Sequence, residues 1–248
     1  MRRYFVAGGT SGIGRQCTVE LLGQGHEVVA VGRTKEHAED LYESIPVDLG
    51  ARLTTMVGDL TDAAATRTIV EETATGPIAG LVNSVGRISA GGIETETAEG
   101  WRTTIATNLD SAFNMTHALL PRLRESPMSA IVNVSSTCSR RPCESLAYSV
   151  SKAALDMFTV HTAKDLARYG IRVNSVNPGV VKTNLQLSSG VVENEAAYET
   201  WLKGMADQHP LGAGKLHDVA SAVLFLLGEE SAWITGAVVP VDGGRSVA

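Results

Sequence analysis

The sequence contains few cysteines and no metal-binding pattern. Its 248 residues include three cysteines, Cys17, Cys138 and Cys143, an odd number without metal-ligand spacing. This usage indicates reduced thiols and predicts a cytoplasmic protein rather than one held together by disulfides. None of the six histidines pairs with another at helical metal-ligand spacing. We therefore expect no metal site.

Long apolar runs and an excess of basic residues are also missing. The run Val219 to Leu227 is interrupted by Ser221 and is far shorter than the ~20 residues that a transmembrane helix needs. Residues 1–6 lead directly into a glycine turn, without an apolar signal segment. The formal net charge of -6 argues against binding to phosphate backbones. Neither a membrane nor a nucleic acid is expected as a partner.

The sequence does contain a regular alternation of strand-like and helix-like segments, without a linker or a break in composition. Strands are predicted at 4–7, 27–31, 52–57, 80–83, 130–134, 172–176 and 237–241. Helices are predicted at 14–23, 35–44, 63–73, 100–123, 148–169 and 217–227. Several strands are continuously apolar, as strands buried on both faces are. The order predicts a single α/β domain over 1–248, a Rossmann-like doubly wound parallel sheet of about seven strands with helices on both faces.

Two glycines and one polar segment refine this outline. Gly25 and Gly170 stand where helices are expected to stop. Residues 185–214 are polar and lie between predicted elements. They form either a solvated helical excursion or a lid over a pocket.

A glycine-rich turn follows the first strand and opens the first helix. Its sequence is Gly8-Gly9-Thr10-Ser11-Gly12-Ile13-Gly14. Glycines allow the backbone to approach a pyrophosphate, and the helix N-terminus supplies N–H donors. The alternative is a tight turn without a ligand, but the strand–turn–helix context favours a dinucleotide site.

The end of the second strand predicts the type of cofactor. An NAD site usually places an acidic residue there for the ribose 2′-hydroxyl. This chain has Gly32-Arg33-Thr34-Lys35, with no acid before Glu36. Because an arginine suits a 2′-phosphate, we expect NADP(H), with NAD less favoured. The alternative is that Arg33 is a solvated loop residue.

Tyr148 and Lys152 are the candidate catalytic pair. Four residues apart, they share one face of a predicted helix. An ammonium beside a phenol favours its ionised form, which lowers the phenol pKa and prepares it to exchange a proton with an alcohol or ketone. Such a pair elsewhere is usually a surface contact. Ser135 and Ser136, at the end of the strand upstream, strengthen the catalytic interpretation.

Together these motifs resemble the short-chain dehydrogenase/reductases, in their single-domain branch of roughly 250 residues, over nearly the whole chain. The turn at 7–14 is similar to the family's glycine turn, with Ala7 in place of threonine. Residues 83–86 are similar to its Asn-Asn-Ala-Gly segment, changed at two positions. The resemblance implies that the cofactor contacts Gly8, Thr10, Ser11, Gly12, Ile13, Gly14, Arg33, Thr34, Asp59, Leu60, Asn83, Val85, Gly86, Tyr148, Lys152, Pro178, Gly179, Val181 and Thr183.

The resemblance also implies the catalytic residues. Ser136, Tyr148 and Lys152 match the family's catalytic serine and Tyr/Lys pair, and Asn108 matches the asparagine that supports a relay water. The spacing from serine to tyrosine is one residue shorter than usual. Counting back from Tyr148 favours Ser135, whereas aligning the strand end favours Ser136. We expect Ser136, because a loop deletion is easier than a shift of a buried strand.

The predicted function is hydride transfer between NADP(H) and a ketone or secondary alcohol, most simply by a ketoreductase. The alternatives are an NAD-dependent alcohol dehydrogenase and a cofactor-binding sensor without catalysis. The substrate pocket is expected from residues 87–94, 139–144 and 185–205, where 137–144 lacks the family's usual glycines. The resemblance implies a homotetramer or homodimer, and the predicted helix 148–169 carries more apolar positions than one core-facing stripe needs.

Overall fold

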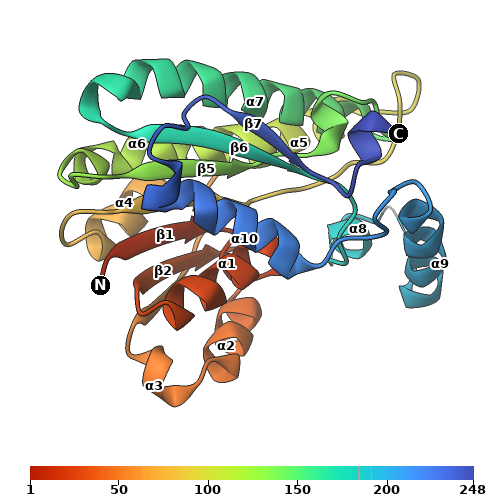
Figure 1. The fold of residues 1–248 in the computed structure, drawn as a ribbon. Coiled ribbons are helices and arrows are strands. Elements are labelled where there is room, and N and C mark those ends of the chain that lie inside the picture. Colours follow the sequence, from red (N-terminus) through yellow and green to blue (C-terminus); the bar gives the residue numbers. More distant parts are fainter. Residues whose placement is uncertain (184, 191) are drawn as a thin grey trace.

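Seven parallel strands form one sheet in the order β3-β2-β1-β4-β5-β6-β7 (Figure 1). The computed structural model describes residues 1–183, 185–190 and 192–248. The strands are β1 (Arg3–Ala7), β2 (Glu27–Gly32), β3 (Leu53–Val57), β4 (Gly80–Asn83), β5 (Ala130–Val134), β6 (Arg172–Pro178) and β7 (Val238–Val241). The Rossmann-like parallel sheet predicted from the sequence is confirmed.

Helices cover both faces of this sheet (Figure 1). They are α1 (Gly12–Gly23), α2 (Lys35–Ser44), α3 (Val47–Gly50), α4 (Ala63–Thr73), α5 (Ala98–Ile105), α6 (Ser111–Arg124), α7 (Leu146–Leu166), α8 (Leu185–Ser188), α9 (Glu195–Ala206) and α10 (Leu216–Leu227). Within the described part of the chain, no helix combines the length and apolar character needed to span a membrane.

The strand residues alternate between two apolar cores, one on each face of the sheet. Tyr4 and Val6 belong to the core that includes side chains of α1 and α10. Phe5 and Ala7 belong to the core that includes side chains of α4 and α6. Successive side chains of a strand point to opposite faces. Burial on both faces therefore explains why these strands are continuously apolar in sequence.

The winding of the chain reverses next to β1. This strand pairs with β2 on one side and with β4 on the other. Ligands of open parallel sheets bind beyond the carboxyl ends of the strands at such a reversal. The loops that follow β1 and β4 are therefore the expected floor of a site.

Some predicted boundaries differ from the structure. The predicted helix 100–123 consists of α5 and α6, joined by a π-helical turn at Ala106–Asp110. The polar segment 185–214 contains α8 and α9, which project beside the sheet (Figure 1); Val191 in this segment lies outside the described residues. Gly25 and Gly170 both have positive φ, 84° and 72°, as predicted for residues that stop a helix.

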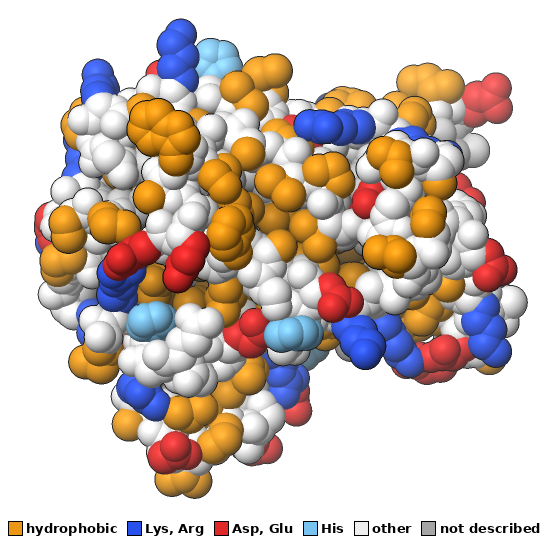
Figure 2. Space-filling model, in the orientation of Figure 1, with side chains coloured by type: hydrophobic (Ala, Val, Ile, Leu, Met, Phe, Trp, Pro, Cys, Tyr) orange, Lys and Arg blue, Asp and Glu red, His pale blue; other side chains and the backbone are white. Residues whose placement is uncertain are grey.

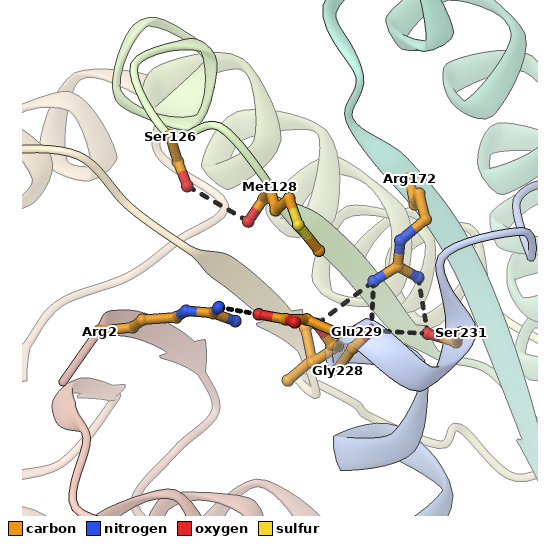
Figure 3. A network of polar contacts seen from close by, with 8 residues as sticks. Arg2, Ser126, Met128, Arg172, Gly228, Glu229 and Ser231 are labelled. Atoms are coloured by element: carbon orange, nitrogen blue, oxygen red, sulfur yellow. Dashed lines mark hydrogen bonds and ion pairs between the residues drawn. The ribbon is translucent and has the colours of Figure 1, made fainter.

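Arg172 closes the C-terminal end of α10 (Figure 3). Its guanidinium donates hydrogen bonds to the carbonyl oxygens of Leu226 (2.7 Å), Leu227 (3.3 Å) and Gly228 (2.9 Å). It also donates to Ser231 Oγ at 2.8 Å. The last carbonyls of a helix have no intrahelical partner and carry partial negative charge. One cation at the start of β6 therefore satisfies the end of a helix that packs on the sheet.

Replacing Arg172 by methionine is expected to lower the free energy of unfolding by about 2 kcal/mol, because it leaves part-buried carbonyls without donors. The melting temperature should fall by about 4–8 °C. Thermal unfolding measures the change. Arg67→Met, on the exposed surface of α4, is the matched control and should change stability by less than ~0.5 kcal/mol. Equal melting temperatures for the two variants would contradict the role of Arg172 in stabilising the C-terminal end of α10.

Candidate active site

A cavity of about 1220 Å³ opens at the carboxyl ends of the strands. Figure 2 shows this face of the molecule hollowed between the sheet and the projecting helix α9. Among the predicted site residues, its wall includes Gly8, Thr10, Ser11, Gly12, Ile13, Arg33, Thr34, Asp59, Leu60, Val85, Gly86, Ser136, Tyr148, Lys152, Pro178, Gly179, Val181 and Thr183. Three others, Gly14, Asn83 and Asn108, are not part of the wall.

The glycine turn presents backbone to the cavity. Gly8 has φ +76°, and a Cβ there would lie 2.8 Å from the carbonyl carbon of Ser84. Gly12 has φ +53° and begins α1. The side chain of Ser11, the N-cap residue, accepts no hydrogen bond from the helix. Among the described residues, the first N–H groups of α1 thus have no side-chain cap from Ser11, which fits a pyrophosphate at this end of the cavity.

Gly14 lies behind the cavity wall and packs against the backbone of Gly8. A Cβ at this position would lie 2.1 Å from the carbonyl oxygen of Gly8. No side chain fits into that space, so only glycine lets α1 pack directly on the turn. Gly14 thus positions the turn, and its contact with the cofactor stays a prediction.

The outer end of the cavity carries opposite charges. Arg33 is exposed and has no ion pair within 4 Å among the described residues. Asp59 accepts hydrogen bonds from the backbone N (2.9 Å) and Oγ1 (2.7 Å) of Thr61. These bonds lower the pKa of the Asp59 carboxyl, and the charge of Arg33 lowers it further. Arg33 is therefore available to an added anion, which fits a 2′-phosphate.

Tyr148 and Lys152 lie at the inner end of the cavity on α7. Ser145 caps this helix, since its side chain accepts a hydrogen bond of 3.2 Å from the backbone N of Tyr148. Lys152 Nζ donates to the carbonyl oxygen of Val134 at 2.9 Å. It lies 5.7 Å from the centre of the Tyr148 ring. Both side chains are buried.

Burial changes both pKa values in the direction that favours neutral groups. It lowers the pKa of Lys152 from 10.5 to about 8. It raises the pKa of Tyr148 above the ordinary value, while hydrogen bonding with the Ser136 side chain opposes the rise. The predicted lowering of the phenol pKa is thus wrong for the protein alone. Desolvation outweighs an ammonium that is directed at a backbone carbonyl rather than at the phenol oxygen.

The two adjacent serines face different partners. Ser135 Oγ donates to the carbonyl oxygen of Lys152 at 3.1 Å, so it binds the α7 backbone. Ser136 Oγ accepts a hydrogen bond from the backbone N of Cys138 at 3.1 Å and also interacts with the Tyr148 hydroxyl. The alternation of an extended chain explains the difference. The geometry supports Ser136 as the serine that shares a substrate with Tyr148.

Asn83 lies inside the protein rather than in the cavity wall. Its Nδ2 donates to Asn133 Oδ1 at 2.8 Å and to Thr116 Oγ1 at 3.3 Å. Asn133 in turn donates to Thr159 Oγ1 at 2.8 Å. These amides join β4 and β5 to the helices behind them, because a buried polar side chain must find partners. The Asn83 side chain thus makes internal contacts, and the cofactor contact of this residue stays a prediction.

Asn108 lies in the π-helical turn, and its side chain is hydrogen-bonded to the backbone of the loop after β4. Its Oδ1 accepts from the backbone N of Arg87 (2.8 Å), and its Nδ2 donates to the Arg87 carbonyl (2.9 Å) and to Ser151 Oγ (2.8 Å). The side chain is therefore engaged with the protein on both of its polar atoms. In the structure it positions the loop and α7, and it does not face the cavity.

Two positioning residues were not predicted. Asn177 Nδ2 donates to the carbonyl oxygen of Ser136 (3.0 Å) and to Asp156 Oδ2 (2.9 Å), which ties β6 to the catalytic strand end. His209 Nε2 accepts from the backbone N of Val180 at 3.0 Å. A Cβ at Gly179 would lie 2.6 Å from the same nitrogen. Asn177 directly precedes the predicted contacts Pro178 and Gly179, whereas nothing in the spacing of the histidines indicated His209.

Beyond Ser136 and Tyr148 the cavity extends into a chamber between the η2 turn (Thr137–Ser139), α8, α9 and the C-terminal segment. The predicted pocket segments contribute Ile88, Ala90, Pro142, Cys143, Glu144, Leu185, Gln186, Trp201 and Met205. Cys138, Gln208 and Arg245 also line it. The chamber is the natural place for a substrate, since it adjoins the two hydroxyls.

Comparisons with known proteins agree with this geometry. A family model described as enoyl-(acyl carrier protein) reductase matches residues 7–246. The chain is 33% identical over 251 residues to 2,3-dihydro-2,3-dihydroxybenzoate dehydrogenase of Bacillus subtilis (strain 168), covering 98% of this chain and 95% of the relative. The family model and this relative both match nearly the full length of the chain.

Solved structures give the same result. A short-chain type dehydrogenase/reductase from Mycobacterium ulcerans is 28% identical with a TM-score of 0.86, covering 99% of this chain and 90% of the other. ElxO with NADP bound is 26% identical with a TM-score of 0.85, covering 98% of each chain. Sequence and fold therefore agree from end to end, and the chain belongs to the short-chain dehydrogenase/reductases, as an oxidoreductase of alcohol and carbonyl groups.

Proposed function

We propose that the protein is an NADP(H)-dependent reductase that converts a ketone into a secondary alcohol and catalyses the reverse oxidation. One observation carries the proposal: the hydroxyls of Ser136 and Tyr148 lie at the inner end of a cavity that runs to the glycine turn and Arg33. The two ends match the two parts of the reaction. The outer end suits a phosphorylated dinucleotide, and the inner end suits a carbonyl group.

The chain's own groups divide the work of the reaction. Ser136 and Tyr148 hold the carbonyl oxygen by hydrogen bonds, and Tyr148 donates its proton to the alkoxide that develops. Lys152 would hold the ribose next to the nicotinamide, and its charge stabilises the phenolate that remains. When bound, the nicotinamide supplies or accepts the hydride, and its oxidised form adds a positive charge.

The residues of the outer end would hold the rest of the cofactor. The N-terminal N–H groups of α1 suit the pyrophosphate, and Arg33 suits the 2′-phosphate. Pro178, Gly179 and Thr183 follow β6 and would pack on the nicotinamide. A turnover assay with a cyclic diketone and each cofactor tests the proposal. Absence of turnover with both cofactors across a panel of ketones would overturn it.

Arg33→Asp tests the choice of cofactor. A carboxylate repels a 2′-phosphate and removes a charge-assisted hydrogen bond, so kcat/KM for NADPH should fall about 10- to 100-fold. The value for NADH should change much less. Lys35→Asp is the control, because it makes the same change in charge at an exposed position outside the cavity wall. Equal kcat/KM for the two cofactors in the unmodified protein would exclude an NADP(H) preference.

We propose further that the chain forms a homotetramer or homodimer through α6 and α7. The exposed residues Phe113, Val150, Met157 and Val160 give these helices an apolar outer surface. A surface of this kind usually marks an interface. Light scattering should give a mass of two or four times 26.1 kDa, and Met157→Lys should reduce it. Met128→Lys, in the loop before β5, is the control. A fully active monomer at low micromolar concentration would contradict the proposal.

A further inference from the structure

Two of the three cysteines meet in the wall of the substrate chamber. Cys138 belongs to the η2 turn after Ser136, and Cys143 belongs to the loop before α7. Both thiols are partly exposed and line the cavity. The two thiols are close enough to influence each other's pKa. Cys17, by contrast, is fully buried in the core between the sheet and α10.

The surroundings of the two thiols make them chemically unequal. Cys143 Sγ lies 3.3 Å from Ser149 Oγ. Hydrogen bonding, first from Cys138 and then from Ser149, lowers the pKa of Cys143 to about 6. The same contact, together with burial, raises the pKa of Cys138. The surroundings therefore favour the thiolate at Cys143 and the thiol at Cys138.

The pair is connected to the catalytic serine through the backbone. The N–H group of Cys138 donates to Ser136 Oγ at 3.1 Å. The turn that carries Cys138 is closed by hydrogen bonds from the backbone N of Arg140 (3.2 Å) and of Arg141 (3.1 Å) to the Thr137 carbonyl. A movement of the Cys138 sulfur towards Cys143 therefore acts on the turn that orients Ser136.

We propose that Cys138 and Cys143 form a dithiol site that reacts with low-molecular-mass disulfides and closes to a Cys138–Cys143 disulfide in the wall of the substrate chamber. The argument rests on three observations: the two cysteines line the same part of the cavity wall, both are partly exposed, and Cys143 Sγ lies within hydrogen-bond distance of Ser149 Oγ. A thiolate in contact with a second thiol is the arrangement in which a mixed disulfide is resolved within one chain.

The reaction balances in two exchange steps. The Cys143 thiolate attacks one sulfur of glutathione disulfide; a new S–S bond forms, and the other glutathione leaves as a thiolate that takes a proton from water. Cys138 loses its proton to solvent and attacks the Cys143 sulfur, which releases the second glutathione. Two protein thiols are thereby oxidised to one disulfide, and one glutathione disulfide is reduced to two thiols.

Closure of this bond is expected to inhibit the enzyme. The two sulfur atoms must approach each other to about 2.05 Å to form a disulfide. The η2 turn must follow, and the hydroxyl of Ser136 loses the geometry that it shares with Tyr148. Reduction of the disulfide should restore this geometry. Turnover then depends on the ratio of thiols to disulfides around the protein.

The test treats the full-length, reduced protein with glutathione disulfide, quenches with an alkylating agent and measures intact and peptide masses. The expected product has lost two hydrogens, contains a linked Cys138–Cys143 peptide pair and retains an alkylatable Cys17. Ketone reduction should fall at least tenfold and recover with dithiothreitol. The mass readout does not depend on the proposed function, so failure of either one is recognised separately.

Two variants make the order of attack visible. Cys138→Ser should stop at a stable mixed disulfide, with one glutathione attached to Cys143. Cys143→Ser should react at least tenfold more slowly, because Cys138 is the weaker nucleophile. Cys143→Ser should keep its own starting turnover after treatment better than the unmodified protein does. Glutathione attached at Cys138, or no linked pair after full treatment, would overturn the proposal.

Discussion

Replacing Tyr148 by phenylalanine is expected to lower kcat by about 10²- to 10⁴-fold, the usual contribution of a positioned general acid. The variant keeps the ring and its packing in a buried position and removes only the transferable proton. Cofactor affinity should change little, because the glycine turn and Arg33 remain. Steady-state kinetics with NADPH, together with a direct titration of cofactor binding, separates the two effects.

Tyr42→Phe provides the matched control. Tyr42 is exposed on α2 and does not line the cavity. The same chemical change at this position should leave kcat unaltered. Full activity of the Tyr148 variant would place the proton donor elsewhere in the chamber and would remove the main support for the mechanism.

Ser136→Ala is expected to lower kcat/KM by about 10²- to 10³-fold, as the loss of one donor to a developing oxyanion does. Ser136 is the serine whose hydroxyl interacts with Tyr148. Ser135→Ala instead removes a 3.1 Å hydrogen bond to the carbonyl of Lys152. Its main effect should be on stability, by about 1 kcal/mol.

The comparison between the two serine variants is sharp, because the residues are neighbours of identical chemistry. Kinetics and thermal unfolding should rank them in opposite orders. If Ser135→Ala had the larger kinetic effect, the carbonyl would be held by the residue that the structure directs at α7. The assignment of the strand end would then have to move by one residue.

The strands and the location of the cavity were predictable because both depend on local sequence. A strand buried on both faces is continuously apolar, and Val132 and Ile131 belong to opposite cores for this reason. The glycine turn is similarly local, since close backbone approaches at Gly8 and Gly14 exclude any side chain. Burial on both faces thus predicts apolar runs, and close backbone approach predicts glycines, so both features can be recognised from the sequence.

The details of the site depend on partners that are distant in sequence. Asn83 finds Asn133 across the sheet, and Arg245 reaches the chamber from the C-terminal segment. The direction of the Tyr148 pKa shift was predicted wrongly for a related reason. A spacing of four residues shows that Lys152 is near, but it shows neither how deeply the phenol is buried nor that Val134 takes the ammonium's hydrogen bond.

The imidazole of His209 joins two parts of the cavity wall, the end of α9 and the segment after β6. Its Nδ1 contacts the carbonyl oxygen of Met205 at the end of α9 (2.7 Å), and its Nε2 accepts from Val180 after β6 (3.0 Å). Displacing α9 alone would break buried hydrogen bonds, each of which costs about 1–3 kcal/mol when left unmade. If residues 178–180 move together with α9, both hydrogen bonds of His209 are kept and this cost does not arise. We therefore expect the end of α9 and residues 178–180 to move together, so that a change on the substrate side of the cavity would also be felt on the proposed cofactor side.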